Sequence, residues 1–142
     1  MIERLGIALA LLALGLGAYT LGTRWQVSRV RRRGISSEIL EALRPGIPAV
    51  IYFWSEGCAP CRLVQKPALE QLQAELGPQG VQIVPVNAVE RPDLADEWGV
   101  LSLPTTFIVD GEGRPRRVNH GVARTGQLRR QIEELGRPAP NK

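Results

Sequence analysis

The chain has few of the side chains that bind metal ions. Its 142 residues include two cysteines, Cys58 and Cys61, and a single histidine, His120. A closed zinc site needs about four nitrogen, sulfur or oxygen ligands, which structural sites take mainly from Cys and His. The Cys pair supplies only two of them. We therefore expect no metal site.

Charge is missing from the first part of the chain. No charged residue occurs between Leu5 and Thr23, a run of 19 residues. As a helix rising about 1.5 Å per residue, this run would be roughly 28 Å long, close to the thickness of a bilayer's hydrocarbon core. It exceeds the ~7–15 apolar residues of a signal peptide, and no A-x-A-like cleavage site follows it. We expect residues 1–23 to be a retained single-pass transmembrane anchor.

Excess positive charge is missing from the rest of the chain. Residues 1–34 contain six arginines and one glutamate, whereas residues 35–142 contain 12 Lys and Arg against 13 Asp and Glu. Nucleic-acid-binding proteins carry a basic face on the folded domain, so we expect no nucleic-acid partner. Five of the six arginines lie in residues 24–36, which we interpret as a basic juxtamembrane linker. Anionic lipid headgroups would attract such a segment.

The chain shows no internal repeat, and beyond residue 36 it alternates between strand and helix patterns. The apolar run PAVIYFWS is typical of a strand that is buried on both faces. Pro67 should kink the helix that follows the Cys pair, and Pro85 needs a strand position without a hydrogen-bond partner. The expected order is a short helix within 36–46, strand 48–55, helix 61–77, strand 81–88, helix 91–100, strand 104–110, strand 114–121 and helix 125–135. This order implies a mixed sheet with helices on its faces.

The stretch CAPC raises three possible roles for its two thiols. For zinc binding, the chain has too few Cys and His ligands. A purely structural disulfide between Cys58 and Cys61 would close a two-residue loop, which constrains the unfolded chain little. The remaining role is a redox dithiol that cycles between thiol and disulfide. Pro60 would stiffen the turn between the thiols, and the small Ala59 would leave the sulfur of Cys58 approachable.

Three motifs in this order resemble the thioredoxin family. They are VIYFWSEGCAPC (50–61), GVLSLPTTFIVDGEG (99–113) and GVARTGQL (121–128). The resemblance covers roughly residues 37–136 and leaves residues 137–142 as a polar tail. It implies a thioredoxin-like three-layer α/β fold, with a mixed central sheet flanked by helices.

The resemblance also implies roles for individual residues. Cys58 would be the nucleophile, at a helix N-terminus that stabilises its thiolate, and Cys61 would be the resolving thiol. Apart from the resemblance, Glu56 lies two residues before Cys58 and is a candidate for proton transfer, the alternative being a solvated loop carboxylate. The Leu103–Pro104 bond would be cis, and the backbone of Leu103 would pair with a substrate strand. The substrate groove would be formed by Ala59, Pro60, Leu103, Pro104 and Gly121.

Some positions depart from the family pattern. Gly57 replaces the Trp that usually precedes the first cysteine. Tyr52 stands where the family has a buried Asp, and Pro85 stands where a Lys often partners that Asp. Pro67 lies one place later, relative to the second cysteine, than the pattern leads us to expect.

These observations favour a membrane-anchored thiol–disulfide oxidoreductase, and within that class a protein-disulfide reductase. Its partners would be a disulfide-containing protein, a thiol or reductase as electron donor, and membrane lipid, and we expect no cofactor beyond the Cys58–Cys61 couple. Two alternatives stay open. One is a non-catalytic thioredoxin-like binding module at the membrane, and the other is an extracytoplasmic disulfide oxidase or isomerase.

The flanking charges bear on the side of the membrane that the redox domain faces. Only Arg4 and the terminal amine precede the apolar run, whereas five arginines follow it. An excess of Lys and Arg marks the cytoplasmic side, although long domains translocate largely regardless of charge. Many anchored relatives in bacteria work outside the cytoplasm. On the charges, we favour a cytoplasm-facing domain.

Overall fold

A computed structural model describes residues 1–32 and 38–136. Residues 33–37 and the expected polar tail lie outside the described residues. The centre of the domain is a four-stranded sheet in the order β2-β1-β3-β4. The strands are β1 (Ala49–Trp54), β2 (Gln82–Asn87), β3 (Thr105–Val109) and β4 (Pro115–His120). β1 pairs with β2 in parallel and with β3 antiparallel, and β3 pairs antiparallel with β4, so the sheet is mixed as expected.

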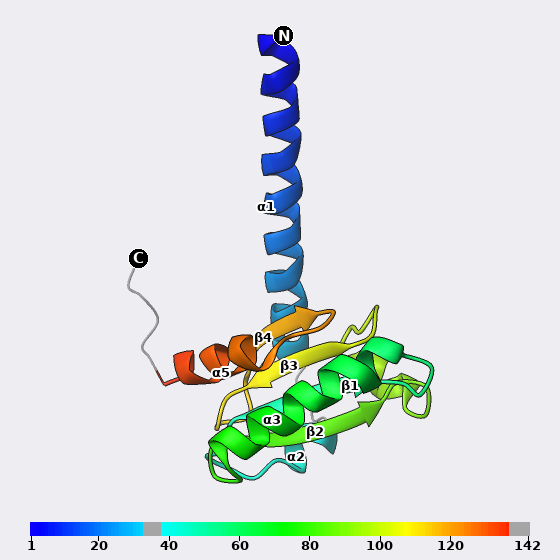
Figure 1. Cartoon of the computed structure of the whole chain (residues 1–142), viewed down its shortest axis with the longest axis vertical. Coiled ribbons are helices and arrows are strands. Elements are labelled where there is room, and N and C mark those ends of the chain that lie inside the picture. Colours follow the sequence, from blue (N-terminus) through cyan, green and yellow to red (C-terminus); the bar gives the residue numbers. More distant parts are fainter. Residues whose placement is uncertain (33–37, 137–142) are drawn as a thin grey trace.

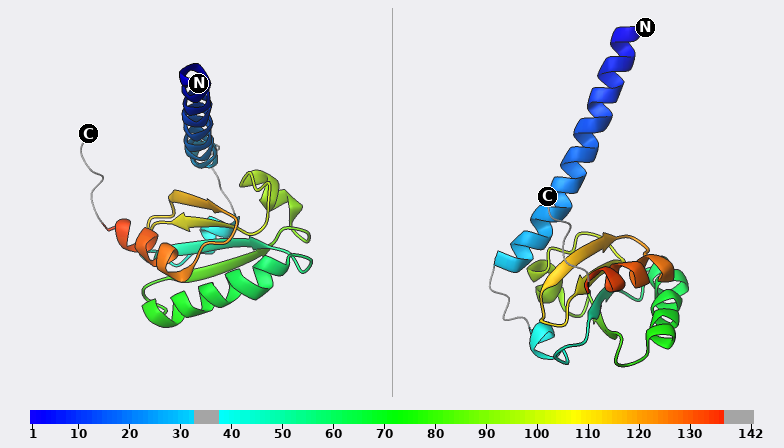
Figure 2. Two further views of the ribbon diagram at one scale, coloured as in Figure 1. Left: turned by 45° about the horizontal axis from the view of Figure 1, so that its top comes forward. Right: turned by 90° about the vertical axis from the view of Figure 1, so that its left-hand side faces the viewer.

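Helices cover both faces of this sheet (Figures 1 and 2). They are α2 (Glu38–Glu41), α3 (Lys66–Leu76), α4 (Pro92–Glu97) and α5 (Thr125–Glu134), and the π-helical turn η1 (Cys61–Gln65) precedes α3. One hydrophobic core lies between the sheet and α2 and α4, and a second lies between the sheet and α3 and α5. The three-layer thioredoxin-like arrangement is therefore confirmed.

Strand β1 explains why the chain has two cores. Its side chains alternate between the two faces, with Val50 and Tyr52 in the α3–α5 core and Ile51 and Phe53 in the α2–α4 core. All four are buried, which accounts for the nearly continuous apolar run in the sequence. β1 is thus one of the two interior strands, paired with β2 on one side and β3 on the other.

Helix α1 (Ile2–Arg32) extends away from the sheet as one continuous helix (Figure 1). Residues Ile2–Trp25 are long and apolar enough to cross a membrane, with a mean hydropathy of 1.9. The expected boundary between anchor and linker at residue 23 is not a helix end. The first nine residues of the basic segment, 24–32, continue the helix because no residue in them breaks it.

Whether Pro67 kinks the helix after the Cys pair stays a prediction. The structure divides the helix after the Cys pair into η1 and α3, and Pro67 occupies the first turn of α3. Helical structure is continuous from Ala59 through η1 into α3, so Pro67 lies inside the helix and its missing N–H falls directly after the π-helical turn. Pro85 lies in β2, an edge strand, where a residue without an N–H donor is tolerated.

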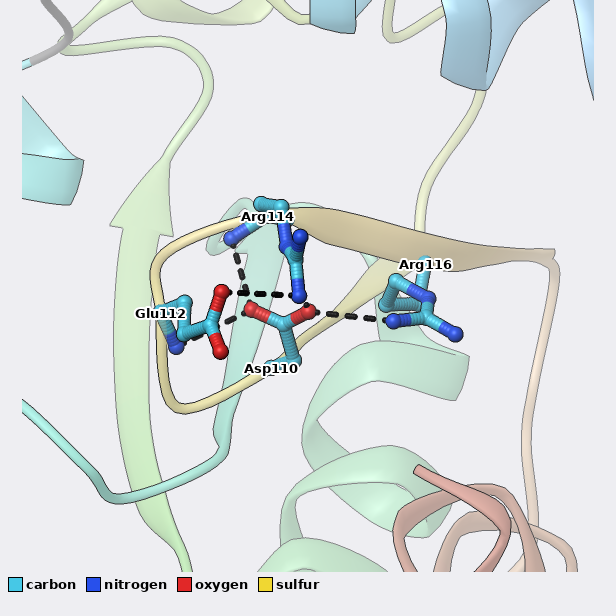
Figure 3. Close-up of polar contacts among 4 residues, drawn as sticks. All are labelled: Asp110, Glu112, Arg114 and Arg116. Atoms are coloured by element: carbon cyan, nitrogen blue, oxygen red, sulfur yellow. Dashed lines mark hydrogen bonds and ion pairs between the residues drawn. The ribbon is translucent and has the colours of Figure 1, made fainter. Parts of the chain in front are cut away.

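The β3–β4 hairpin is closed by a buried carboxylate (Figure 3). Asp110 accepts hydrogen bonds from the backbone N–H groups of Glu112 and Arg114, at 3.0 and 2.9 Å. The side chains of Arg114 and Arg116 each reach its other oxygen at 3.1 Å. Burial alone would raise the pKa of Asp110, but these donors outweigh it and lower the pKa of the carboxyl. Asp110 therefore stabilises the turn as a carboxylate.

Candidate active site at the end of strand β1

The two cysteines lie immediately beyond the end of β1. They form a disulfide with an S–S distance of 2.12 Å and a Cα–Cα distance of 5.3 Å. Cys58 is partly exposed and directly precedes the first helical residue, Ala59, whereas Cys61 is fully buried. The backbone N–H of Cys61 donates a hydrogen bond of 3.2 Å to Sγ of Cys58. The accessible sulfur is therefore also the one that receives a helix-terminal N–H, a placement that stabilises a thiolate.

The expected groove residues lie in two segments beside this pair. Ala59 and Pro60 are exposed in the turn between the cysteines. The Leu103–Pro104 bond is cis, as the sequence motif led us to expect. The carbonyl of Pro104 accepts a hydrogen bond of 2.9 Å from the N–H of Gly121. Gly121 has a φ of +82°, a conformation that favours glycine.

Leu103, in the second of these segments, packs against the core. Its side chain and that of Cys58 pack, both partly buried, against the same α3–α5 core cluster. Leu103 also packs against the α2–α4 core cluster, so it contacts both cores. Whether a substrate strand pairs with the Leu103 backbone stays a prediction.

Tyr52 contacts the buried cysteine through a hydrogen bond. Its hydroxyl donates a hydrogen bond of 2.8 Å to the carbonyl of Cys61. Burial raises the pKa of Tyr52 to about 12, so at neutral pH this side chain is an uncharged donor and not a base. The position beside the buried cysteine thus holds a phenol, with no ionised carboxylate supplied by β1.

A cavity of about 650 Å³ opens beside this pair, between α3 and the β1–β2 side of the sheet. Tyr52, Pro85 and Cys61 line it, and Glu56 and Lys66 contribute charged side chains. Glu56 itself is exposed in the turn before Cys58. The structure therefore brings Glu56 to the same cavity as the buried cysteine, although it does not test the proton-transfer role.

Sequence reasoning missed Gln65, the last residue of η1. Its side chain is fully buried and binds the backbone of Ala123 twice. The sequence did contain a signal, because Gln65 lies four and seven positions before the core residues Leu69 and Leu72. A polar residue on the buried face of a helix needs partners, and here they come from a segment 58 residues away.

Trp98 lies in the α2–α4 core, and His120 is the last residue of β4. Trp98 is fully buried and packs edge-on against Phe107, with ring centroids 4.9 Å apart. His120 pairs with Thr105 across β3 and β4. Across residues 1–32 and 38–136, no group of three or more His, Cys, Asp or Glu side chains is arranged to bind a metal ion.

Comparison with known proteins agrees with this geometry. The family model Thioredoxin matches residues 36–134, a region that begins after α1. Thioredoxin 1 of Synechococcus elongatus is 34% identical over 85 residues, which cover 60% of this chain and 78% of that protein. Thioredoxin of Alicyclobacillus acidocaldarius is 30% identical over 95 residues, which cover 67% of this chain and 88% of that protein.

Solved structures show the same fold. A chloroplastic thioredoxin z has a TM-score of 0.61 at 28% identity and covers 71% of this chain and 90% of its own. Mitochondrial thioredoxin 3 from Saccharomyces cerevisiae has a TM-score of 0.57 at 26% identity, over 68% of this chain and 84% of its own. The family match, the three-layer fold and the disulfide-forming pair agree. The chain therefore belongs to the thioredoxin family of thiol–disulfide oxidoreductases, with Cys58 and Cys61 as its disulfide-capable pair.

Proposed function

We propose that this protein is a membrane-anchored protein-disulfide reductase. The observation that carries the proposal is the contrast between the two sulfurs: Cys58 is partly exposed and receives the N–H of Cys61, whereas Cys61 is buried. The sulfur of Cys58 can therefore react with a protein substrate first, and the sulfur of Cys61 reacts in a second step.

In the proposed reaction the reduced protein transfers two electrons to the substrate. The Cys58 thiolate attacks one sulfur of the substrate disulfide, and the other substrate sulfur leaves as a thiolate that takes up a proton. The Cys61 thiolate then attacks Sγ of Cys58 in the mixed disulfide. The second substrate sulfur leaves as a thiol, and the Cys58–Cys61 disulfide remains.

The groove assignment follows from the segments that flank Cys58. The small side chain of Ala59 leaves the approach to the sulfur open, and the segment of Leu103 and Pro104 provides backbone that a substrate strand pairs with. Gly121 supports that segment through its N–H bond to Pro104. This groove would take an extended stretch of a disulfide-containing protein.

Glu56 is the proposed proton acceptor for Cys61. The supporting observation is that Glu56 and Cys61 line one cavity, while the neighbouring Tyr52 stays protonated at neutral pH. Glu56→Gln should shift the pH profile of the second step to higher pH and leave the labelling of Cys58 unchanged. An unaltered pH profile would remove Glu56 from the mechanism.

The direction of electron flow is tested by the potential of the Cys58–Cys61 couple against glutathione. A reductase has a low potential, near that of thioredoxin at about −270 mV, whereas a value near −120 mV would mark an oxidant. An insulin-reduction assay with a dithiol donor tests turnover. If wild type and Cys58→Ser show the same background rate, the protein is a non-catalytic binding module instead.

The anchoring and sidedness are proposed from α1 and the charges that follow its apolar part. A span over Ile2–Trp25 with arginines beyond it favours a redox domain on the cytoplasmic side, where cellular thiols or a reductase would supply electrons. Membrane lipid would contact the apolar run. Reporter fusions after Lys142 test the cytoplasmic location of the redox domain. A fluorescent fusion to green fluorescent protein supports this location, and an active alkaline phosphatase fusion contradicts it.

A further inference from the structure

The helix that carries the cysteines contains an unusual turn. The N–H of Lys66 donates to the carbonyl of Cys61, five residues back, where an α-helix would bond four residues back. This π-turn accommodates one extra residue before α3 continues. It ends at Gln65, the buried polar side chain described above, and single π-turns of this kind occur frequently at functional sites.

The side-chain amide of Gln65 bonds both the N–H and the C=O of Ala123, as the backbone of a neighbouring strand would. Its Nε2 donates to the carbonyl of Ala123 at 2.9 Å, and its Oε1 accepts from the N–H of Ala123 at 2.8 Å. Both Gln65 and Ala123 are fully buried. The two bonds therefore have no competition from water, and the loss of either would leave a backbone group of Ala123 unsatisfied.

The partner segment also reaches the other side of the proposed groove. Gly121 lies two residues before Ala123, and its N–H donates to the carbonyl of Pro104 at 2.9 Å. Residues 121–123 are thus tied at one end to Pro104 and at the other to Gln65. The cysteine-bearing helix and the Pro104 segment are connected through this short bridge.

We propose that Gln65 is a positioning residue that sets the spacing between the Cys58–Cys61 turn and the Pro104 segment. This inference rests on the proposed reductase function for its kinetic readout. Gln65 does not touch the reacting sulfurs. It acts through Ala123 and Gly121 on the width of the groove, so its loss impairs the binding of a protein disulfide more than the chemistry at Cys58.

The test compares two substitutions in the full-length protein in detergent micelles. Gln65→Met keeps the length and burial of the side chain but removes both bonds to Ala123. Thr125→Val is the matched control, because the Thr125 hydroxyl donates to the carbonyl of Ala68 at 3.0 Å and also ties the start of α5 to α3. Only the first substitution removes a contact with residues 121–123.

With insulin as the disulfide substrate, Gln65→Met should raise KM about fivefold or more while kcat changes less than about twofold. Thr125→Val should leave both constants close to those of the wild type. Gln65→Leu also removes both bonds without burying a charge, so it should raise KM in the same way, and it replaces Gln65→Met if that variant does not fold. Equal effects of the Gln65 and Thr125 substitutions, or a loss confined to kcat, would overturn the proposal.

A second measurement does not depend on turnover. Hydrogen–deuterium exchange of residues 121–123 should be at least about tenfold faster in Gln65→Met than in Thr125→Val. If the wild type does not reduce insulin, the proposed function fails, and this exchange difference still decides whether Gln65 positions the segment. Equal exchange in the two variants would contradict the positioning role even in an active enzyme.

Discussion

Tyr52 lies directly opposite Pro85 in the parallel pair of β1 and β2, and its hydroxyl donates a hydrogen bond of 2.8 Å to the carbonyl of Cys61. The thioredoxin pattern leads one to expect an Asp and a Lys at these two positions. In this chain an uncharged phenol faces a proline ring, and both line the cavity beside the buried cysteine. Tyr52 therefore provides a structural hydrogen bond next to the buried Cys61 and no negative charge.

Removal of this hydroxyl should lower stability modestly. Tyr52→Phe keeps the ring in the core and removes one buried hydrogen bond, while the Cys61 carbonyl keeps the N–H of Lys66 as a donor. We expect the free energy of unfolding to fall by about 1 kcal/mol, measured by urea denaturation of the oxidised protein. A loss above about 3 kcal/mol would mean that the hydroxyl has a further role.

The same tyrosine should make stability sensitive to alkaline pH. Because the folded pKa of about 12 exceeds the unfolded value of about 10, the native state retains its proton where the unfolded state has lost it. The contribution of protonated Tyr52 to the free energy of unfolding is complete below pH 10 and is lost as the pH rises from 10 to 12. The wild type should therefore lose unfolding free energy more steeply than Tyr52→Phe in this window. Parallel curves would contradict the raised pKa.

Asp110 should make stability sensitive to acid. Its folded pKa is lowered, so its contribution is present above the unfolded value of about 3.9 and disappears as the pH falls through the folded pKa. Asp110→Asn should cost about 1–3 kcal/mol at pH 7, and the difference from the wild type should shrink below pH 4. Denaturant unfolding at several pH values measures it. Glu112→Gln, at an exposed position, should change stability by less than about 0.5 kcal/mol.

The two thiols should differ in reactivity once reduced. Cys58 is partly exposed and receives the N–H of Cys61, whereas Cys61 is buried, so iodoacetamide should modify Cys58 well before Cys61. Mass spectrometry of the reduced wild type after brief labelling gives the order, and Cys58→Ser and Cys61→Ser serve as single-thiol controls. Similar rates at the two sites would refute the helix-terminus argument.

The proposed order of attack can be trapped. In Cys61→Ser the resolving thiol is absent, so the mixed disulfide between Cys58 and a substrate protein should accumulate in cells. It should disappear on reduction and be absent from the Cys58→Ser, Cys61→Ser double variant. Recovery of adducts from Cys58→Ser alone would reverse the roles of the two cysteines.

Much of the fold follows from local sequence patterns. The apolar run of β1 predicted a strand buried on both faces, and Gly113, with a φ of +79°, lies in the turn between the strands predicted at 104–110 and 114–121. The order of strands and helices and the mixed sheet were predicted from these patterns, the cis bond before Pro104 was predicted from the motif resemblance, and all are confirmed. Each of these depends on neighbouring residues or on a short motif, which one sequence displays directly.

Contacts between distant residues were decided by the tertiary structure. The sequence shows that Pro67 lies one place later than in the family pattern, but only the structure shows the π-turn that directly precedes α3. Gln65 finds its partner Ala123 across 58 residues, and the Tyr52 hydroxyl reaches the Cys61 carbonyl only when β1 and η1 pack together. Side-chain periodicity indicates which face of an element is buried. A polar group's partner depends on how separate elements pack, which local periodicity does not encode.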